Sequence, residues 1–146
     1  MYLDTGIINK LLTPEPETAW FETQPRGHPF STSELALVEV RPALFANERT
    51  GRSTTAQPLR AEGEFHEWVE TELLVRHPLN HAALRKSIHV LTMTHPDVPL
   101  RTLDALHVAT CDLSQGFPFC TTDERMHDAT KLRRLPLFPT TLPLTA

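Results

Sequence analysis

The chain has 146 residues, of which 40% are hydrophobic and 22% charged, and this composition is typical of one ordinary globular domain. Its formal net charge of −4 argues against binding of nucleic acid by the protein surface as a whole. No apolar run approaches the roughly 20 residues that cross a bilayer, and the amino terminus MYLDTG lacks the basic region of a secretory signal. We therefore expect a single domain over residues 1–146, located in the cytoplasm and without membrane contact.

Short apolar segments alternate with longer helical segments along the chain. The expected strands cover residues 1–4, 29–32, 73–76, 117–120 and 135–138. The expected helices cover 5–12, a segment through Trp20 and Phe21, 33–49, 53–71, 80–94, 102–113 and 123–131. This alternation predicts an α/β domain with a central, mostly parallel sheet.

Hydroxyl side chains and prolines mark several expected boundaries. Thr5 and Thr102 are suited to cap the helices that follow them. Pro42 lies inside the helix expected over 33–49 and should kink it or divide it. Prolines crowd the end of the chain, so residues 139–146 are expected to form an extended tail.

Cysteine and histidine spacing gives little support for a disulfide or a zinc site. Cys111 and Cys120 have no CxxC spacing and lie in apolar surroundings, so we expect buried free thiols. His77 and His81 are four residues apart, which on a helix could bind zinc. Pro78 lies between them in an expected strand-to-helix turn, and this disfavours zinc.

Four acidic residues lie inside or at the end of apolar runs, namely Asp4, Glu39, Asp104 and Asp123. Burying a carboxylate without a partner costs several kcal/mol, so such positions need compensation. A divalent cation compensates several carboxylates at once. Helix capping and buried ion pairs are the alternative explanation, and both remain open at this point.

The local context differs among these acids. Asp4 and Asp123 directly follow expected strands, and parallel sheets bind ligands beyond the carboxyl ends of their strands. Glu39 lies in LVEV, where its apolar neighbours are expected in the core. Asp104 lies in the first turn of its helix, where the macrodipole favours an acid by ~0.3–1 kcal/mol without any function. The same explanation applies to Asp123.

Four segments of the chain resemble a known family. YLDTGIINKLL, STSELALVEV, LRTLDALHVAT and FCTTDERM are similar, in order and spacing, to the four motifs of PIN-domain ribonucleases, and especially to VapC-type toxins of bacterial toxin–antitoxin pairs. The resemblance spans nearly the whole chain. It implies a three-layer α/β/α fold, an RNA substrate, a homodimer and a cognate antitoxin that inserts near the active site.

The resemblance also implies roles for particular residues. Asp4, Glu39, Asp104 and Asp123 are expected to surround Mg²⁺, with Mn²⁺ as a possible substitute. We expect Asp4 and Asp104 as direct ligands, and Glu39 and Asp123 in outer-shell or second-metal roles. The supporting hydroxyls implied by the resemblance are those of Thr5 and Thr121. Two alternatives stay open: a PIN-like module that binds RNA or protein without cleavage, and a metal-dependent DNA nuclease.

Three further side chains are candidates for the same site. Arg125, two residues after Asp123, and Arg41 are candidates for contacts with substrate phosphate, although ordinary surface solvation also explains an arginine. His107 follows Asp104 by three residues and could face the same cleft. A buried structural histidine with satisfied hydrogen bonds is the alternative for His107.

Overall fold

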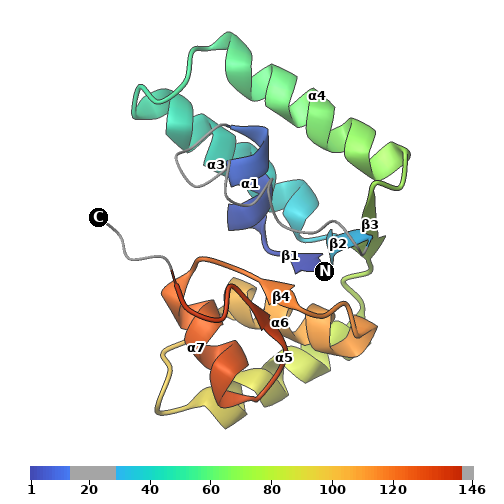
Figure 1. Ribbon diagram of the computed structural model, residues 1–146, viewed down its shortest axis with the longest axis vertical. Helices are drawn as coiled ribbons and strands as arrows, with labels where there is room; N and C mark the ends of the chain where they lie inside the picture. Colours follow the sequence, from blue (N-terminus) through green and yellow to red (C-terminus); the bar gives the residue numbers. More distant parts are fainter. Residues whose placement is uncertain (14–28, 143–146) are drawn as a thin grey trace.

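A parallel β-sheet lies between two layers of helices in the computed structural model, which describes residues 1–13 and 29–142 (Figure 1). The strands are β1 Tyr2–Leu3, β2 Phe30–Ser33, β3 Leu74–His77, β4 Phe119–Cys120 and β5 Leu137–Phe138. They form one five-stranded sheet in the order β3-β2-β1-β4-β5, and every neighbouring pair is parallel. The predicted parallel sheet is confirmed.

The helices divide between the two faces of this sheet (Figure 1). One layer contains α1 Thr5–Leu12, α3 Ala36–Arg49 and α4 Ala56–Glu70. The opposite layer contains α5 His81–Thr94, α6 Thr102–Ser114 and α7 Glu124–Leu132. The predicted three-layer α/β/α fold is therefore confirmed, and a helix through Trp20 and Phe21 falls outside the described residues, as does the end of the expected tail.

The core consists of two clusters, one on each face of the sheet. Leu3 and Cys120 belong to the cluster under α1, α3 and α4, whereas Tyr2 and Phe119 belong to the cluster under α5 to α7. Successive residues of a strand point to opposite faces, so each two-residue central strand contributes to both clusters. Both cysteines are free and buried, as predicted.

Two predicted helix caps and the predicted effect of Pro42 differ from the structure. Asp4, and not Thr5, is the N-cap of α1: its backbone is extended and its carboxylate accepts a hydrogen bond from the Ile7 amide. Arg101, and not Thr102, occupies the N-cap position of α6, without a side-chain cap. Helix α3 continues across Pro42 as one element, so of the two predicted effects of this proline, a kink or a division, the division is wrong.

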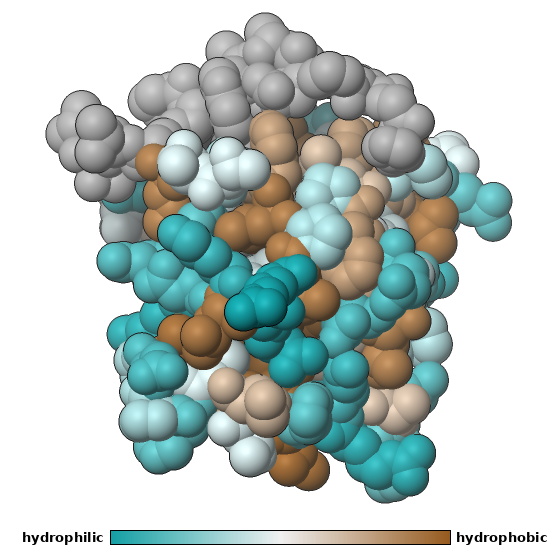
Figure 2. All heavy atoms as spheres, turned by 60° about the horizontal axis from the view of Figure 1, so that its bottom comes forward, coloured by the Kyte–Doolittle hydropathy of each residue, from teal (hydrophilic) through white to brown (hydrophobic). Residues whose placement is uncertain are grey.

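The surface combines polar and apolar side chains. Figure 2 shows hydrophilic and hydrophobic residues interspersed on the face that lies at the bottom of Figure 1. Ile88 and Met93 on α5 are examples of exposed apolar side chains. In the described part of the chain, no helix combines the length and the hydrophobicity that a membrane span requires.

Candidate active site

The chain reverses its direction of travel across the sheet at β1 and β4. From β1 it proceeds through β2 to β3, and it then returns to place β4 on the other side of β1. Ligands of open α/β sheets bind at such a switch point, beyond the carboxyl ends of the strands. Asp4 directly follows β1, and Thr121 directly follows β4.

A pocket of about 590 Å³ lies at this switch point. Its walls come from α1 and the residue before it, α3, the first half of α6, and the segment that runs from the end of β4 into the first turn of α7. The lining residues are Asp4, Thr5, Gly6, Asn9, Glu39, Pro42, Ala43, Leu103, Asp104, His107, Thr122, Asp123 and Met126. The structure thus brings the four predicted acids and Thr5 to one pocket.

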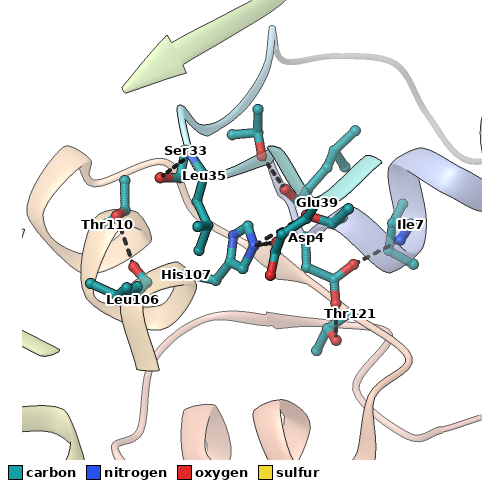
Figure 3. Close-up of polar contacts among 12 residues, drawn as sticks. Asp4, Ile7, Ser33, Leu35, Glu39, Leu106, His107, Thr110 and Thr121 are labelled. Carbon is teal, nitrogen blue, oxygen red and sulfur yellow. Dashed lines mark hydrogen bonds and ion pairs between the residues drawn. The ribbon is translucent and has the colours of Figure 1, made fainter. Parts of the chain in front are cut away.

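Asp4 is the most deeply buried of the four acids, with 1% of its surface exposed. One carboxylate oxygen, Oδ1, accepts a hydrogen bond of 2.7 Å from the Ile7 amide, and the other, Oδ2, accepts one from the Thr121 hydroxyl (Figure 3). Burial raises the pKa of Asp4, the two hydrogen bonds oppose this rise, and the nearby Asp123 adds to it. Ionising this carboxyl group therefore requires compensation from its surroundings.

Asp104 and Asp123 are less buried than Asp4. Asp104 lies in the first turn of α6, and its pKa is raised by partial burial and then by the neighbouring Asp123. Asp123 is exposed and is the N-cap of α7, where its carboxylate accepts a hydrogen bond of 3.0 Å from the Met126 amide. Asp123 therefore starts a helix, as the sequence predicted, and also lines the pocket.

Thr121 connects the two strand ends. Its hydroxyl donates to Asp4 and accepts a hydrogen bond of 3.0 Å from the Asp123 amide. Thr121 is fully buried, and it holds the segments after β1 and β4 in a defined relation. This geometry is consistent with the supporting role that the resemblance implies for this residue.

The Glu39 carboxylate is held by two side-chain hydrogen bonds and by none from the backbone among the contacts of the described residues. Glu39 lies in the first turn of α3, and its Oε2 accepts a hydrogen bond of 2.6 Å from the Thr5 hydroxyl. The same oxygen accepts a hydrogen bond of 2.7 Å from His107 Nε2 (Figure 3). Burial raises the pKa of Glu39, but the hydrogen bonds and electrostatic influence of His107 and Thr5 outweigh burial and lower it. The expectation that both neighbours of Glu39 lie in the core is wrong, because Val38 is 72% exposed while Val40 is buried.

Both hypotheses for His107, a side chain that faces the cleft and a buried structural histidine, agree with the structure. It lines the pocket, and it is also buried with hydrogen-bond partners at both ring nitrogens. Nδ1 lies 2.9 Å from the Tyr2 hydroxyl, and Nε2 contacts Glu39 and lies 3.2 Å from the Thr5 hydroxyl. The histidine is therefore a satisfied buried group that reaches the site.

Asn9 lines the pocket and was not predicted as a site residue from the sequence. Asn9 lies one turn after Thr5 on α1, and this four-residue spacing was the available signal for a shared face. Its Oδ1 atom is buried and has no hydrogen-bond partner among the described residues. An unpaired buried acceptor beside four carboxylates indicates a place for a ligand or an ordered water.

The predicted arginines do not meet in the pocket. Arg41 is exposed, and its guanidinium is bound to the Glu62 carboxylate at 2.5 and 2.8 Å. Arg125 is half-buried on α7 and is absent from the pocket lining. The structure therefore gives no support to Arg41 as a phosphate ligand at this site.

The donor set of the pocket fits a hard divalent cation. Among residues 1–13 and 29–142, no group of three or more Asp, Glu, His or Cys side chains is already arranged to hold a metal ion. His77 is therefore not part of such a group. Carboxylate oxygens are nevertheless the ligands that Mg²⁺ and Mn²⁺ prefer, and Mg²⁺ commonly keeps several waters and uses one or two carboxylates. Burial and the neighbouring Asp123 raise the pKa values of Asp4 and Asp104, so a nearby cation would stabilise the charged forms of both groups.

Comparisons with known proteins agree with this geometry. The family model described as PIN domain matches residues 1–132. A protein of Mycobacterium tuberculosis described as Ribonuclease VapC46 is 34% identical over 139 residues, which cover 90% of each chain. Two solved structures share the fold: FitAcB from Neisseria gonorrhoeae, with a TM-score of 0.65, 16% identity and coverage of 94% and 95% of the two chains, and a toxin–antitoxin complex from Klebsiella pneumoniae, with a TM-score of 0.57, 15% identity and coverage of 84% and 85%.

Proposed function

The chain belongs to the PIN domain family and is a relative of the VapC ribonucleases, and from this we propose that it is a metal-dependent endoribonuclease that acts as the toxin of a type II toxin–antitoxin pair. The observation that carries the proposal is the convergence of Asp4, Glu39, Asp104 and Asp123 on one pocket at the switch point of the sheet. These acids come from four separate segments, so a purely local helix-end explanation does not account for their meeting.

We propose Mg²⁺ as the cofactor, with Mn²⁺ as a substitute. Asp4 and Asp104 would hold the ion directly, and Glu39 and Asp123 would act through bound water or a second ion. When bound, such an ion lowers the pKa of a coordinated water and neutralises charge on the phosphate oxygens. The donor types and the clustering of raised pKa values at Asp4 and Asp104 support this assignment.

The protein itself orients the Asp4 carboxylate and favours the charged form of Glu39. Thr121 and the Ile7 amide orient the Asp4 carboxylate, so that its remaining lone pairs are available to the pocket. Glu39 has a lowered pKa because His107 and Thr5 outweigh its burial, and it is therefore charged near neutral pH. A charged carboxylate beside the pocket can accept a hydrogen bond from the attacking water.

The partners follow from the relatives and remain proposals. We propose RNA as the substrate because the relative from Mycobacterium tuberculosis is described as a ribonuclease. We propose a cognate antitoxin as the protein partner because the structure from Klebsiella pneumoniae, described as a toxin–antitoxin complex, shares this fold. A homodimer, a cytoplasmic location and a single nuclease domain over residues 1–146 stay predictions.

Cleavage of total RNA by the purified protein tests the proposed function. We expect cleavage with Mg²⁺ or Mn²⁺, no cleavage with excess chelator, and loss of cleavage in Asp4→Asn. The matched control is Asp97→Asn, which changes an exposed acid after α5 that does not line the pocket and should leave cleavage intact.

The same assay separates the alternatives. RNA binding without cleavage under any metal condition would contradict the enzyme and favour a binding module. Cleavage of single-stranded DNA at a rate equal to that of RNA would instead indicate a general nuclease.

A further inference from the structure

A chain of hydrogen bonds connects the sheet to the pocket. The Tyr2 hydroxyl on β1 lies 2.9 Å from His107 Nδ1, and His107 Nε2 lies 2.7 Å from Glu39 Oε2. The two contacts join residues separated by 105 and 68 positions in the sequence. Tyr2 and His107 are both buried, with 0% and 2% of their surface exposed, so water does not compete for these bonds.

The direction of each hydrogen bond follows from the chemistry of the groups. A tyrosine phenol ordinarily keeps its proton near neutral pH, so the Tyr2 hydroxyl can donate it to Nδ1. A neutral His107 then carries its hydrogen on Nε2, which donates to the Glu39 carboxylate. Nε2 also carries a hydrogen in the imidazolium form, so donation to Glu39 is independent of the charge on His107.

This arrangement orients the Glu39 side chain. Both hydrogen bonds found for Glu39 in the described residues end on Oε2, one from His107 and one from the Thr5 hydroxyl. Two donors at 2.6 and 2.7 Å on one oxygen restrict rotation of the carboxylate. Oε1 is then the oxygen left to act toward water, a metal ion or substrate in the pocket.

Core packing alone does not explain a histidine at this position. Its neighbours on α6, Ala105, Val108 and Ala109, belong to the apolar core cluster. An apolar residue of similar volume would fill the same space without any need for hydrogen-bond partners at two ring nitrogens. A polar ring is explained by the contacts of its two nitrogens: Nδ1 contacts Tyr2 in the sheet, and Nε2 contacts Glu39 in the pocket.

We propose that His107 is a positioning residue that holds Glu39 in its working orientation, and that the Tyr2 hydroxyl in turn selects the Nε2–H tautomer of His107. This inference rests on the proposed nuclease function for its kinetic consequences, but not for the tautomer. Tyr2 does not line the pocket, so its effect on the reaction passes through His107.

Three variants test this role. His107→Leu removes the donor while keeping an apolar side chain in the core, and His107→Gln restores an amide donor near the position of Nε2. Tyr2→Phe removes only the distant hydroxyl. We expect His107→Leu to lower kcat about 10–100-fold, the usual cost of losing an outer-shell partner, with KM changed much less. His107→Gln should recover at least about tenfold of that loss, and Tyr2→Phe should show a smaller decrease in kcat.

Spectroscopy of the metal-free protein provides a readout that does not depend on activity. Long-range ¹H–¹⁵N NMR should show the hydrogen of neutral His107 on Nε2 in the wild type, with a mixed tautomer population in Tyr2→Phe. Mn²⁺ titration should show weaker binding in His107→Leu and recovery in His107→Gln. Thermal unfolding with chelator establishes that each variant is folded, and Tyr2→Phe serves if His107→Leu does not fold.

The outcomes are distinct from those that test the proposed function. A folded His107→Leu with wild-type kcat and Mn²⁺ affinity would overturn the positioning role, as would a His107→Gln no better than His107→Leu. A hydrogen on Nδ1 in the wild type would overturn the role of Tyr2. If the wild-type protein cleaves no RNA, the proposed function fails, and the tautomer and the Mn²⁺ affinities still decide this inference.

Discussion

The Thr121 hydroxyl donates a hydrogen bond to the Asp4 carboxylate across 117 residues of sequence. The bond joins the ends of β1 and β4, which are adjacent strands at the switch point of the sheet. Because Asp4 is fully buried, this bond and the one from the Ile7 amide are its local compensation for lost hydration.

Thr121→Val should therefore destabilise the protein and impair the site. The substitution keeps the shape but leaves the Asp4 oxygen without its donor, at a cost of about 1–3 kcal/mol in the free energy of unfolding. Urea unfolding in chelator measures this change. Thr121→Ser retains the hydroxyl and is the matched control, so an equal loss in both variants would contradict a role for the hydrogen bond.

The stability of the metal-free protein should depend on Asp4 in a pH-dependent manner. The pKa of Asp4 is raised in the folded state by burial, so the folded state binds its proton more tightly than the unfolded state does. The stability associated with this proton is present below the unfolded pKa of about 3.8 and is lost as pH rises through the folded pKa. Asp4→Asn should thus match the wild type at low pH and become the more stable protein near neutral pH.

Thermal unfolding of both proteins in chelator across pH 4–8 measures this difference in stability. A difference that shrinks with rising pH would contradict the prediction.

Mg²⁺ should raise the wild-type melting temperature more as pH increases, because protons compete with the ion for Asp4 and Asp104, whose pKa values are raised. Glu39 has the opposite sign: its pKa is lowered, so its contribution is present above the unfolded pKa and lost as pH falls through the folded value.

Gly6→Ala should reduce cleavage of RNA without unfolding the protein. A Cβ atom at Gly6 would lie 3.3 Å from Asp4 Oδ1, so the carboxylate must shift by a few tenths of an ångström. In contrast, a Cβ at Gly63 on α4 meets nothing within 4 Å. Gly63→Ala should stabilise its helix by about 0.5–1 kcal/mol and leave cleavage unchanged. Equal activities of the two variants would show that Asp4 tolerates the displacement.

Asn9→Ala should separate stability from activity. The Asn9 Oδ1 atom is buried without a partner, so removing it should leave the free energy of unfolding unchanged or raise it by about 1 kcal/mol. RNA cleavage should fall about tenfold, because this oxygen lines the pocket and can accept one hydrogen bond of ordinary strength in the substrate complex. Ser31→Ala removes another unpartnered buried oxygen that does not line the pocket, and it should leave cleavage unchanged.

The alternation of strands and helices was predictable because each element depends on the pattern of residues within its own short segment. At Asp4 a two-residue strand is followed directly by an acid that caps a helix, and at Asp123 an acid caps a helix three residues after the end of another two-residue strand. Local residue preferences were insufficient to predict which residue occupies each helix N-cap. Asp and Thr are both suitable N-caps, and the choice of Asp4 over Thr5 depends on where β1 ends and on the Ile7 amide.

By itself, the sequence determined the α/β class, and it singled out the four acids that line one pocket and placed two of them after strands. Only the tertiary structure decided that β4 lies beside β1, that Thr121 bonds Asp4, and that His107 connects Tyr2 to Glu39. It also paired Arg41 with Glu62 and left Val38 exposed. The physical reason is that periodicity and capping act over about four residues, whereas these contacts depend on strand order and packing between distant segments.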